Sequence, residues 1–177
     1  EHEREGVLPD LVCIGKALGG GLPLSACLGS REVMDAWPES GGEALHTSTF
    51  LGHPLSCATA LAFLDVLEEE NLAARALDLG DRIVGRLSEA LSTQTGVKQI
   101  RGCGLLIGIE LCSQDGEPVV GGGAVVAEAA LRQGLLVLPA GGQGEVVEIA
   151  PPAVSNDAQI DFGVTCLVET INEALSS

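Results

Sequence analysis

Aromatic and basic residues are both scarce in this sequence. Aromatic residues make up only 2% of the 177 residues and Tyr is absent, so Leu, Val, Ile and Ala must fill any packed interior. Only 9 Lys and Arg residues stand against 25 Asp and Glu residues, which leaves a net charge of −16. Because so acidic a chain repels phosphate groups, we expect neither a nucleic-acid partner nor binding to an anionic membrane surface.

The sequence also lacks any apolar run of the roughly 18–20 residues that a membrane-spanning helix needs. Its first residues, EHEREG, contain neither an initiator Met nor the pattern of a secretory signal peptide. We therefore expect a soluble protein of the cytoplasm or, in a eukaryote, of the mitochondrion. The same beginning suggests that the chain is a piece of a longer protein.

None of the six cysteines forms a Cys-x-x-Cys pair, and most of them lie inside apolar runs. This favours buried free thiols in a reducing cytoplasm over disulfides or metal ligands. His46 and His53 are candidates for acid–base or metal chemistry, but no third ligand has a suitable spacing, so we expect no metal site. The cysteines are Cys13, Cys27, Cys57, Cys103, Cys112 and Cys166.

The first 70 residues mix short apolar runs with loops. Residues 11–14 predict one strand and residues 24–28 a second. Ser30 is a candidate N-cap for a short helix, and Pro54 suits the first position of a helix that continues to about Glu69. That longer helix is apolar on almost every side, which is typical of a buried helix.

From residue 72 onwards, helix and strand patterns alternate. An apolar stripe predicts a helix over residues 72–91, and Asn156 with Gln159 predicts a capping box at the start of the last helix. Between them lie a shorter helix ended by Gly134 and three strands, read from VKQIRGCGLLIGIEL, LLVLPA and EVVEIAPP. The pattern predicts an α/β fold with two units, residues 1–71 and 72–177, of which the second is a small α/β domain.

The stretch LVCIGKALGGGLP places Lys16 at the end of an apolar run and follows it with three glycines, Gly19–Gly21. Partial burial disfavours the charged form of an amine, and a neutral lysine can attack a carbonyl carbon. Glycines let a bulky cofactor approach the backbone because they carry no Cβ atom. An ordinary strand-end lysine in water explains the same stretch, since lysine followed by glycines is a common pattern.

The stretch HTSTFLGHP places three hydroxyl side chains, Thr47, Ser48 and Thr49, just before the predicted long helix. Hydroxyls and unpaired backbone N–H groups at a helix N-terminus bind phosphate well, and the helix dipole favours an anion there. A simple N-cap with exposed Thr and Ser neighbours is the alternative interpretation.

Together these two stretches closely resemble the class-III, fold-type-I aminotransferases, which use pyridoxal phosphate and include acetylornithine, ornithine, 4-aminobutyrate and other ω-amino-acid enzymes. The resemblance rests on PDLVCIGKALGGGLPLSACLG and HTSTFLGHPLSCATALAFLDVL, and continues through QIRGCGLLIGIEL, LLVLPAG and IAPPAVSNDAQID. It implies that residues 1–71 are the end of the fold-type-I large, cofactor-binding domain, and that residues 72–177 are the small C-terminal domain.

The resemblance also implies roles for single residues. Lys16 matches the lysine that forms the internal aldimine with the cofactor. Thr49 matches the threonine that binds the cofactor phosphate, usually from the neighbouring subunit, so a homodimer is expected. Ser48 beside it is expected to touch cofactor or substrate.

Two positions depart from the pattern of that family. His53 replaces the asparagine that usually precedes the proline. Glu148 stands where many members carry an arginine that binds the substrate carboxylate, four residues before Pro152. A carboxylate there repels an α-carboxylate, which leaves amine donors and unusual amino-acid donors open.

The resemblance implies a transaminase that moves an amino group from an amine or amino acid to a keto acid, with Lys16 as acid and base. The family's cofactor-ring stack, glycine-containing phosphate loop and pyridine-binding aspartate all precede the lysine, outside this sequence. A non-catalytic fragment or dimerisation module therefore stays an alternative. So does a decarboxylase, a racemase or a lyase on the same scaffold.

Overall fold

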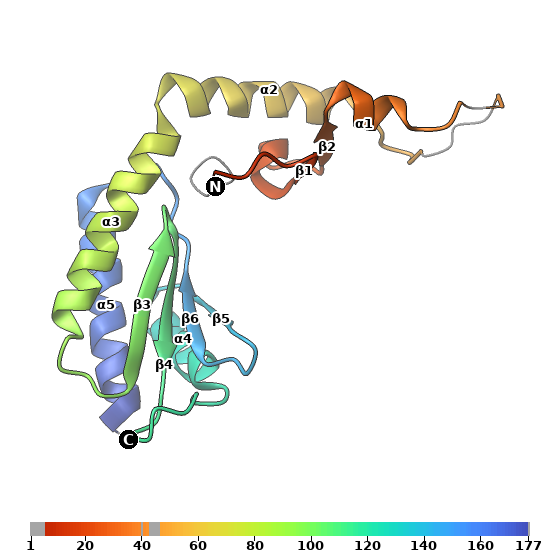
Figure 1. The fold of residues 1–177 in the computed structure, drawn as a ribbon. Coiled ribbons are helices and arrows are strands. Elements are labelled where there is room, and N and C mark those ends of the chain that lie inside the picture. Colours follow the sequence, from red (N-terminus) through yellow and green to blue (C-terminus); the bar gives the residue numbers. More distant parts are fainter. Residues whose placement is uncertain (1–5, 40, 43–46, 177) are drawn as a thin grey trace. The chain divides into compact units, whose positions relative to one another are not determined.

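The computed structural model describes residues 6–39, 41–42 and 47–176 (Figure 1). The chain divides into two compact units, Glu1–Glu70 and Asn71–Ser177. We predicted that the first unit is the C-terminal end of a large cofactor-binding domain and that the second is a small domain. Both assignments stay predictions. Among the described residues, each helix is too short or too polar to cross a membrane.

The first unit is built on a pair of short strands. β1 (Leu11–Ile14) pairs antiparallel with β2 (Ala26–Gly29), and the 3-10 helix η1 (Lys16–Gly19) follows β1 directly. The short helix α1 (Arg31–Asp35) begins after Ser30, whose hydroxyl accepts a hydrogen bond from the backbone N–H of Val33, so the predicted cap is confirmed. The second strand begins two residues later than the sequence indicated.

The long helix α2 (Pro54–Glu69) begins at the predicted proline, but the prediction that it is buried is wrong for this chain. Only Ser56 and Ala60 are buried. Four of its larger apolar side chains are between 42 and 63% exposed: Leu55, Leu61, Leu64 and Val66. Two strands of four residues each offer too little surface to cover a helix that is apolar all round.

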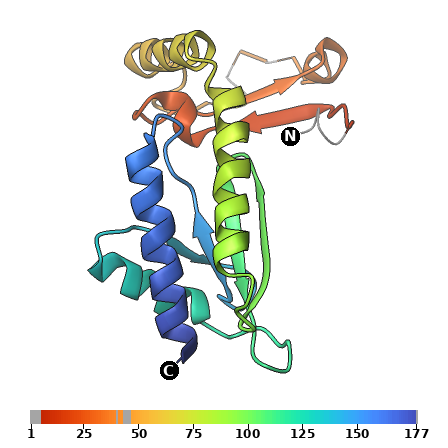
Figure 2. The same ribbon diagram turned by 90° about the vertical axis from the view of Figure 1, so that its left-hand side faces the viewer.

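The second unit is a four-stranded antiparallel sheet with helices (Figure 2). The strand order is β3-β4-β6-β5, and the three helices are α3, α4 and α5. Figure 2 shows α3 and α5 running side by side over one face of the sheet. The elements are β3 (Val97–Cys103), β4 (Leu106–Leu111), β5 (Leu138–Ala140), β6 (Val146–Ile149), α3 (Leu72–Ala90), α4 (Gly122–Arg132) and α5 (Asp157–Ser176).

The segment VKQIRGCGLLIGIEL is a hairpin rather than the single strand predicted for it. β3 turns back at Gly104, which has a φ of 55°, and β4 then runs antiparallel to it. Glycine adopts this backbone conformation without the steric cost that a Cβ atom adds. The hairpin places alternate residues of both strands on the same face of the sheet.

The core of the second unit confirms the apolar stripe predicted for residues 72–91, and α5 buries a stripe of its own. Residues of α3 and α5 pack against the inner face of the sheet, and the most deeply buried include Leu87, Ile109, Val147 and Ile171. The predicted capping box is also present: the backbone N–H of Asn156 donates to Oε1 of Gln159, and the backbone N–H of Gln159 donates to Oδ1 of Asn156, each at 2.9 Å.

Candidate functional site

Lys16 is the first residue of η1, two positions after the end of β1. Its φ of 51° is positive, and Asn71 is the other non-glycine residue with a positive φ in the described part of the chain. A non-glycine residue in this region costs on the order of 1–3 kcal/mol and persists only where its surroundings hold it. Hydrogen bonds that close the turn do so here: Leu18 N–H donates to the carbonyl of Gly15, and Gly20 N–H to that of Ala17.

The Lys16 side chain is exposed, so the predicted partial burial of its amine is wrong for this chain. Ile14 and Cys13, which precede it in β1, are exposed as well. The strand pair has the apolar sequence of a buried sheet, but the described residues do not cover it. The amine is therefore open to a ligand and to water.

The glycines that follow Lys16 have two different surroundings. A Cβ atom on Gly20 would lie 2.7 Å from the carbonyl oxygen of Thr59, so this glycine lets the turn pack against α2. The Thr59 hydroxyl donates a hydrogen bond of 2.7 Å to the carbonyl of Gly19. A Cβ atom on Gly21 would have no neighbour within 4 Å. The glycines after Lys16 were expected to leave space for a cofactor. The structure leaves such space at Gly21 but not at Gly20.

Ser48 and Thr49 lie in the turn that leads into α2, and both are exposed. The N-cap of α2 is His53, which makes no side-chain capping hydrogen bond, so neither hydroxyl acts as the cap. The ring of His53 instead packs edge-on against Phe50, with 5.8 Å between the ring centroids. The first-turn N–H groups of α2 and two nearby hydroxyls thus remain available to an anion. His46 lies outside the described residues.

No hydrogen bond or ion pair joins Lys16 to Ser48 or Thr49 within the part of the chain that the structure describes. Lys16 belongs to the turn that packs against α2 at Thr59, whereas the two hydroxyls precede the first turn of that helix. The structure therefore presents two separate polar sites, an amine and a pair of hydroxyls.

Glu148 is half-buried in β6, in the second unit. Its neighbours Val147 and Ile149 point into the core, so alternation places Glu148 on the outer face of the sheet, away from α3 and α5. Across the strands it pairs with Gly108 on one side and Leu138 on the other. Gly108 has no side chain, and a Cβ atom there would lie 3.1 Å from Cγ1 of Val146, which shares this face with Glu148.

Three further charged residues share this outer face, and the sequence analysis missed them. Glu110 accepts a hydrogen bond from Lys98 at 2.9 Å and from Arg101 at 2.6 Å. The hydrogen bonds from Lys98 and Arg101 lower the pKa of the Glu110 carboxyl below its ordinary value. Arg101 pairs with Gly108 on the side opposite to Glu148. Recognising the hairpin in the sequence would have placed these charges on one face.

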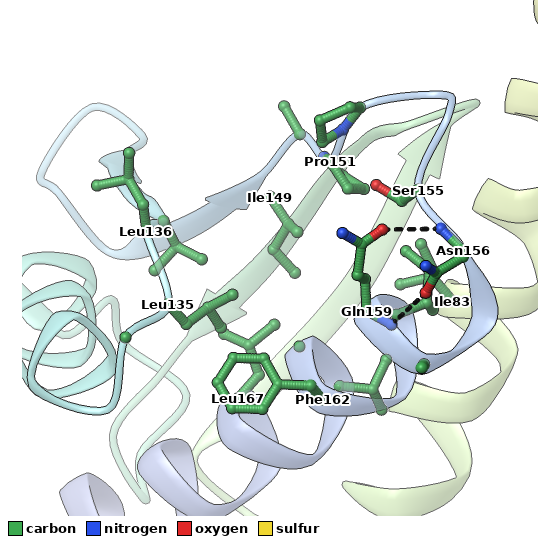
Figure 3. A pocket seen from close by; sticks show the side chains of 18 residues that line it. Ile83, Leu135, Leu136, Ile149, Pro151, Ser155, Asn156, Gln159, Phe162 and Leu167 are labelled. Carbon is green, nitrogen blue, oxygen red and sulfur yellow. Dashed lines mark hydrogen bonds between the residues drawn. The ribbon is translucent and has the colours of Figure 1, made fainter.

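The second unit contains a cavity of about 680 Å³ (Figure 3). The residues that line it differ in character from the charged residues of the outer face. Its lining is mostly apolar and includes Leu135, Ile149 and Phe162, with Asn156 and Gln159 of the capping box as polar groups. Its lining includes none of the predicted site residues. Ile149 belongs to the inner face of β6, so the cavity and the Glu148 carboxylate lie on opposite faces of that strand.

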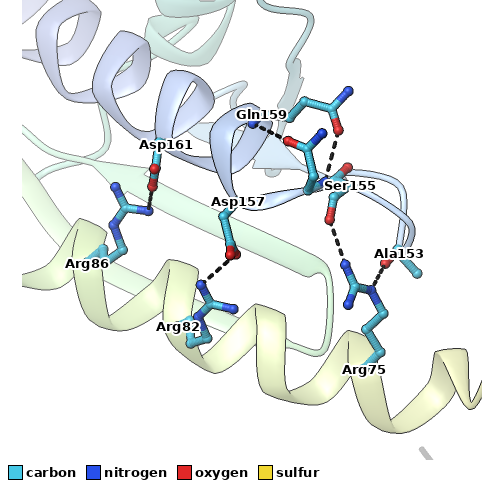
Figure 4. A network of polar contacts seen from close by, with 9 residues as sticks. Arg75, Arg82, Arg86, Ala153, Ser155, Asp157, Gln159 and Asp161 are labelled. Atoms are coloured by element: carbon cyan, nitrogen blue, oxygen red, sulfur yellow. Dashed lines mark hydrogen bonds and ion pairs between the residues drawn. The ribbon is translucent and has the colours of Figure 1, made fainter.

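Arginines of α3 hold the segment that follows β6 (Figure 4). Arg75 donates from Nε to the carbonyl of Ala153 at 2.6 Å and from Nη2 to that of Ser155 at 2.8 Å. Arg82 pairs with Asp157 at 2.9 Å and, chiefly through this hydrogen bond, lowers the pKa of the Asp157 carboxyl. The Arg82 ion pair is exposed and adds little stability. Arg75 is therefore the residue that holds this segment, which follows Glu148 in the sequence.

The cysteines differ from the expectation of buried thiols. None of the six is part of a disulfide, but Cys13 and Cys27 are exposed, and Cys57 and Cys103 are half-buried. Only Cys112 and Cys166 are buried. Among the residues that the structure describes, no three His, Cys, Asp or Glu side chains are grouped so that they could hold a metal ion.

Comparison with known proteins points to one family. The family profile described as Aminotransferase class-III matches residues 1–171. Ornithine aminotransferase 1 of Staphylococcus saprophyticus is 38% identical over 97% of this chain and 40% of its own length. Acetylornithine aminotransferase of Methanothermobacter thermautotrophicus is 40% identical over 95% of this chain and 40% of its own length.

A solved structure gives the same result for the fold. It is the PLP-bound form of an amine transaminase from an uncultivated Pseudomonas species, with a TM-score of 0.85 and 29% identity over 97% of this chain and 40% of that one. This likeness confirms the predicted fold class, an α/β fold that corresponds to the C-terminal part of a fold-type-I enzyme. The chain spans about 40% of the length of the relatives that it matches.

Proposed function

Since this chain belongs to the class-III aminotransferases, as its motifs predicted, we propose that it is the C-terminal part of a transaminase that uses pyridoxal phosphate. The enzyme transfers an amino group from an amine or amino acid to a keto acid. The observation that carries the proposal is Lys16. The backbone of this lysine is held at a positive φ two positions after the end of β1, its amine is exposed, and Gly21 beyond it borders open space.

The residues present fit such a cofactor at two points. An exposed amine at Lys16 can hold an aldehyde group covalently. Ser48 and Thr49, with the first-turn N–H groups of α2, suit a phosphate group. When bound, pyridoxal phosphate supplies an electron sink for the bond that breaks at the substrate Cα. The part of this chain is to hold the cofactor and, through the Lys16 amine, to move a proton at the substrate.

We further propose a homodimer in which Ser48 and Thr49 bind the phosphate held by the neighbouring subunit. Two observations support this arrangement. Lys16 makes no described contact with either hydroxyl, and the exposed apolar side chains of α2 have the character of a surface that another protein surface covers. A single subunit would then contribute the amine to one site and the hydroxyls to the other.

The proposed function is tested with protein expressed from the complete reading frame. Addition of pyridoxal phosphate should give a visible absorbance band that disappears when an amino donor is added and returns with a keto acid. A protein that acts only as a dimerisation module gives the spectrum of free cofactor. A decarboxylase, racemase or lyase on the same scaffold consumes the donor without passing its amino group to the keto acid.

Replacing Thr49 with valine should weaken cofactor binding about tenfold or more, because a hydrogen bond to a charged group contributes about 1.5–3 kcal/mol. Valine keeps the shape of the side chain and removes the hydroxyl. Titration of the apoprotein with pyridoxal phosphate measures the change in Kd. Thr47→Val is the matched control, an exposed threonine two residues earlier, and it should bind as the wild type does. Equal Kd values for the two variants would show that the Thr49 hydroxyl does not bind the phosphate.

Glu148 is the residue that we propose for donor selection. The half-buried Glu148 carboxylate, which lies across from Gly108, attracts a cationic or neutral group and repels an α-carboxylate. Glu148→Arg should therefore raise turnover of donors with a carboxylate and lower that of diamines. The ratio of the two kcat/KM values should change by about tenfold to a hundredfold, in keeping with 1.5–3 kcal/mol per charge-assisted hydrogen bond.

The control for this charge reversal is Asp115→Arg, which changes an exposed carboxylate in the loop after β4. It alters the net charge of the protein by the same amount and should leave the ratio unchanged. If Glu148→Arg and Asp115→Arg give the same preference between diamines and amino acids, the Glu148 carboxylate faces solvent and takes no part in donor binding.

A further inference from the structure

Leu138 is an apolar neighbour of Glu148 on the outer face of the second unit's sheet. The two residues are direct partners in the antiparallel register of β5 and β6. Directly opposite side chains on one face of such a pair have Cβ atoms about 4.5–5.5 Å apart, which is close enough for a leucine to lie against a glutamate. The proposed transaminase reaction has assigned no role to Leu138.

The surroundings of Glu148 differ on its two sides. On the β4 side the Val146 side chain lies close to Gly108, and Val146 is only 6% exposed although it shares the outer face. On the β5 side Leu138 is 55% exposed. A molecule that reaches the Glu148 carboxylate along the outer face therefore finds its apolar contact at Leu138.

Glu148 has no ion-pair partner within residues 6–39, 41–42 and 47–176. Lys98 and Arg101 of the same face both bind Glu110, at 2.9 and 2.6 Å. Because a carboxylate that is partly removed from water needs a compensating charge, the half-buried Glu148 favours a cationic ligand. Glu148 and Leu138 thus offer a ligand a negative group and an apolar surface side by side.

We propose that Leu138 is a specificity-determining residue and that the donor it favours is a diamine with an aliphatic chain. This inference rests on the proposed function and on the part of Glu148 in it. The ammonium group at the far end of the donor binds the Glu148 carboxylate, and the methylene chain lies against the Leu138 side chain. Leu138 takes no part in proton transfer and acts only through contact with the donor.

Two donors of equal length and charge test this contact. They are 1,5-diaminopentane and its analogue with an ether oxygen in place of the central methylene group. The apolar contact favours the first, since one buried methylene group is worth about fourfold in binding. Protein from the complete reading frame, loaded with pyridoxal phosphate, should therefore show a higher kcat/KM for 1,5-diaminopentane than for the ether.

Leu138→Ser should reduce this ratio of kcat/KM values by about fourfold or more. Leu131→Ser is the matched control, because Leu131 of α4 is 59% exposed, and it should keep the wild-type ratio. Calorimetric titration of the protein without added cofactor should give the same change in the ratio of the two Kd values. Leu138→Thr, which suits a strand, should act as Leu138→Ser does and serves if the serine variant fails to fold.

The proposal is overturned if the wild type and both Leu138 variants discriminate equally between the two donors. It is also overturned if these variants lower the melting temperature and slow both donors by the same factor, since Leu138 then packs against another part of the enzyme. If the wild type transfers no amino group from any donor to a keto acid, the proposed function itself fails, and this inference fails with it.

Discussion

Replacing Lys16 with arginine should lower the turnover number of the transaminase by about a thousandfold or more, since loss of a positioned acid–base group alone costs about 10²–10⁴-fold. Arginine keeps the positive charge and the length of the side chain. Its guanidinium is not deprotonated in proteins, so it can neither attack a carbonyl carbon nor accept a proton from a substrate. The amino donor should still bind, and the visible absorbance of the wild type with cofactor should be absent.

Lys98→Arg is the control for this variant, because Lys98 is the other lysine of the sequence. Lys98 lies 2.9 Å from Glu110 in an ion pair that arginine can also form, so activity should persist. Borohydride reduction of the cofactor-loaded wild type, followed by peptide mapping, should place the label on Lys16. A label on Lys98, or turnover by Lys16→Arg at the wild-type rate, would falsify the assignment.

Gly80→Ala should destabilise the second unit by about 3 kcal/mol or more, at the upper end of the costs of overpacking. A Cβ atom on Gly80 would lie 2.0 Å from the carbonyl oxygen of Gly104 and 2.5 Å from its carbonyl carbon. Backbone atoms in the turn of a hairpin cannot rotate aside as a side chain can. Either α3 moves away from the hairpin or the turn between β3 and β4 deforms.

The melting temperature should fall by about 10 °C or more, because each kcal/mol shifts it by about 4–8 °C in a unit of this size. Gly85→Ala is the matched control on the same helix, since a Cβ atom there has no neighbour within 4 Å. Alanine at that position should stabilise α3 by about 0.5–1 kcal/mol through helix propensity alone. Thermal melts of both variants, followed by circular dichroism, make the comparison. Equal melting temperatures would mean that α3 and the hairpin are not packed as described.

The second unit was the part of the fold that the sequence predicted best. The stripes of α3 and α5 repeat over about five turns, and a period sustained that long has few other interpretations. The hairpin of β3 and β4 was missed because its turn, Gly104 and Leu105, is only two residues long and lies within an apolar segment. A glycine at the first position of a two-residue loop was the available signal, since such turns require a positive φ there.

The candidate site was predicted unevenly. The motifs of Lys16 and Thr49 are local and could be matched in the sequence, and their roles stay predictions. The exposure of the Lys16 amine could not be predicted, because apolar neighbours in the sequence do not reveal what covers them in space. The pairing of Leu138 with Glu148 depends on strand register, which the sequence pattern does not specify for so short a strand.

The apolar surface of α2 has a consequence for how the chain behaves in solution. Leu55 and Leu61 are 58 and 63% exposed, and exposed leucines on one helix favour association of chains. The net charge of −16 opposes this by mutual repulsion. Repulsion between surfaces is screened beyond about 10 Å at 0.1 M salt, whereas the attraction between leucines is not. Raising the ionic strength should therefore favour association of chains through α2, and a buffer of low ionic strength should keep them apart.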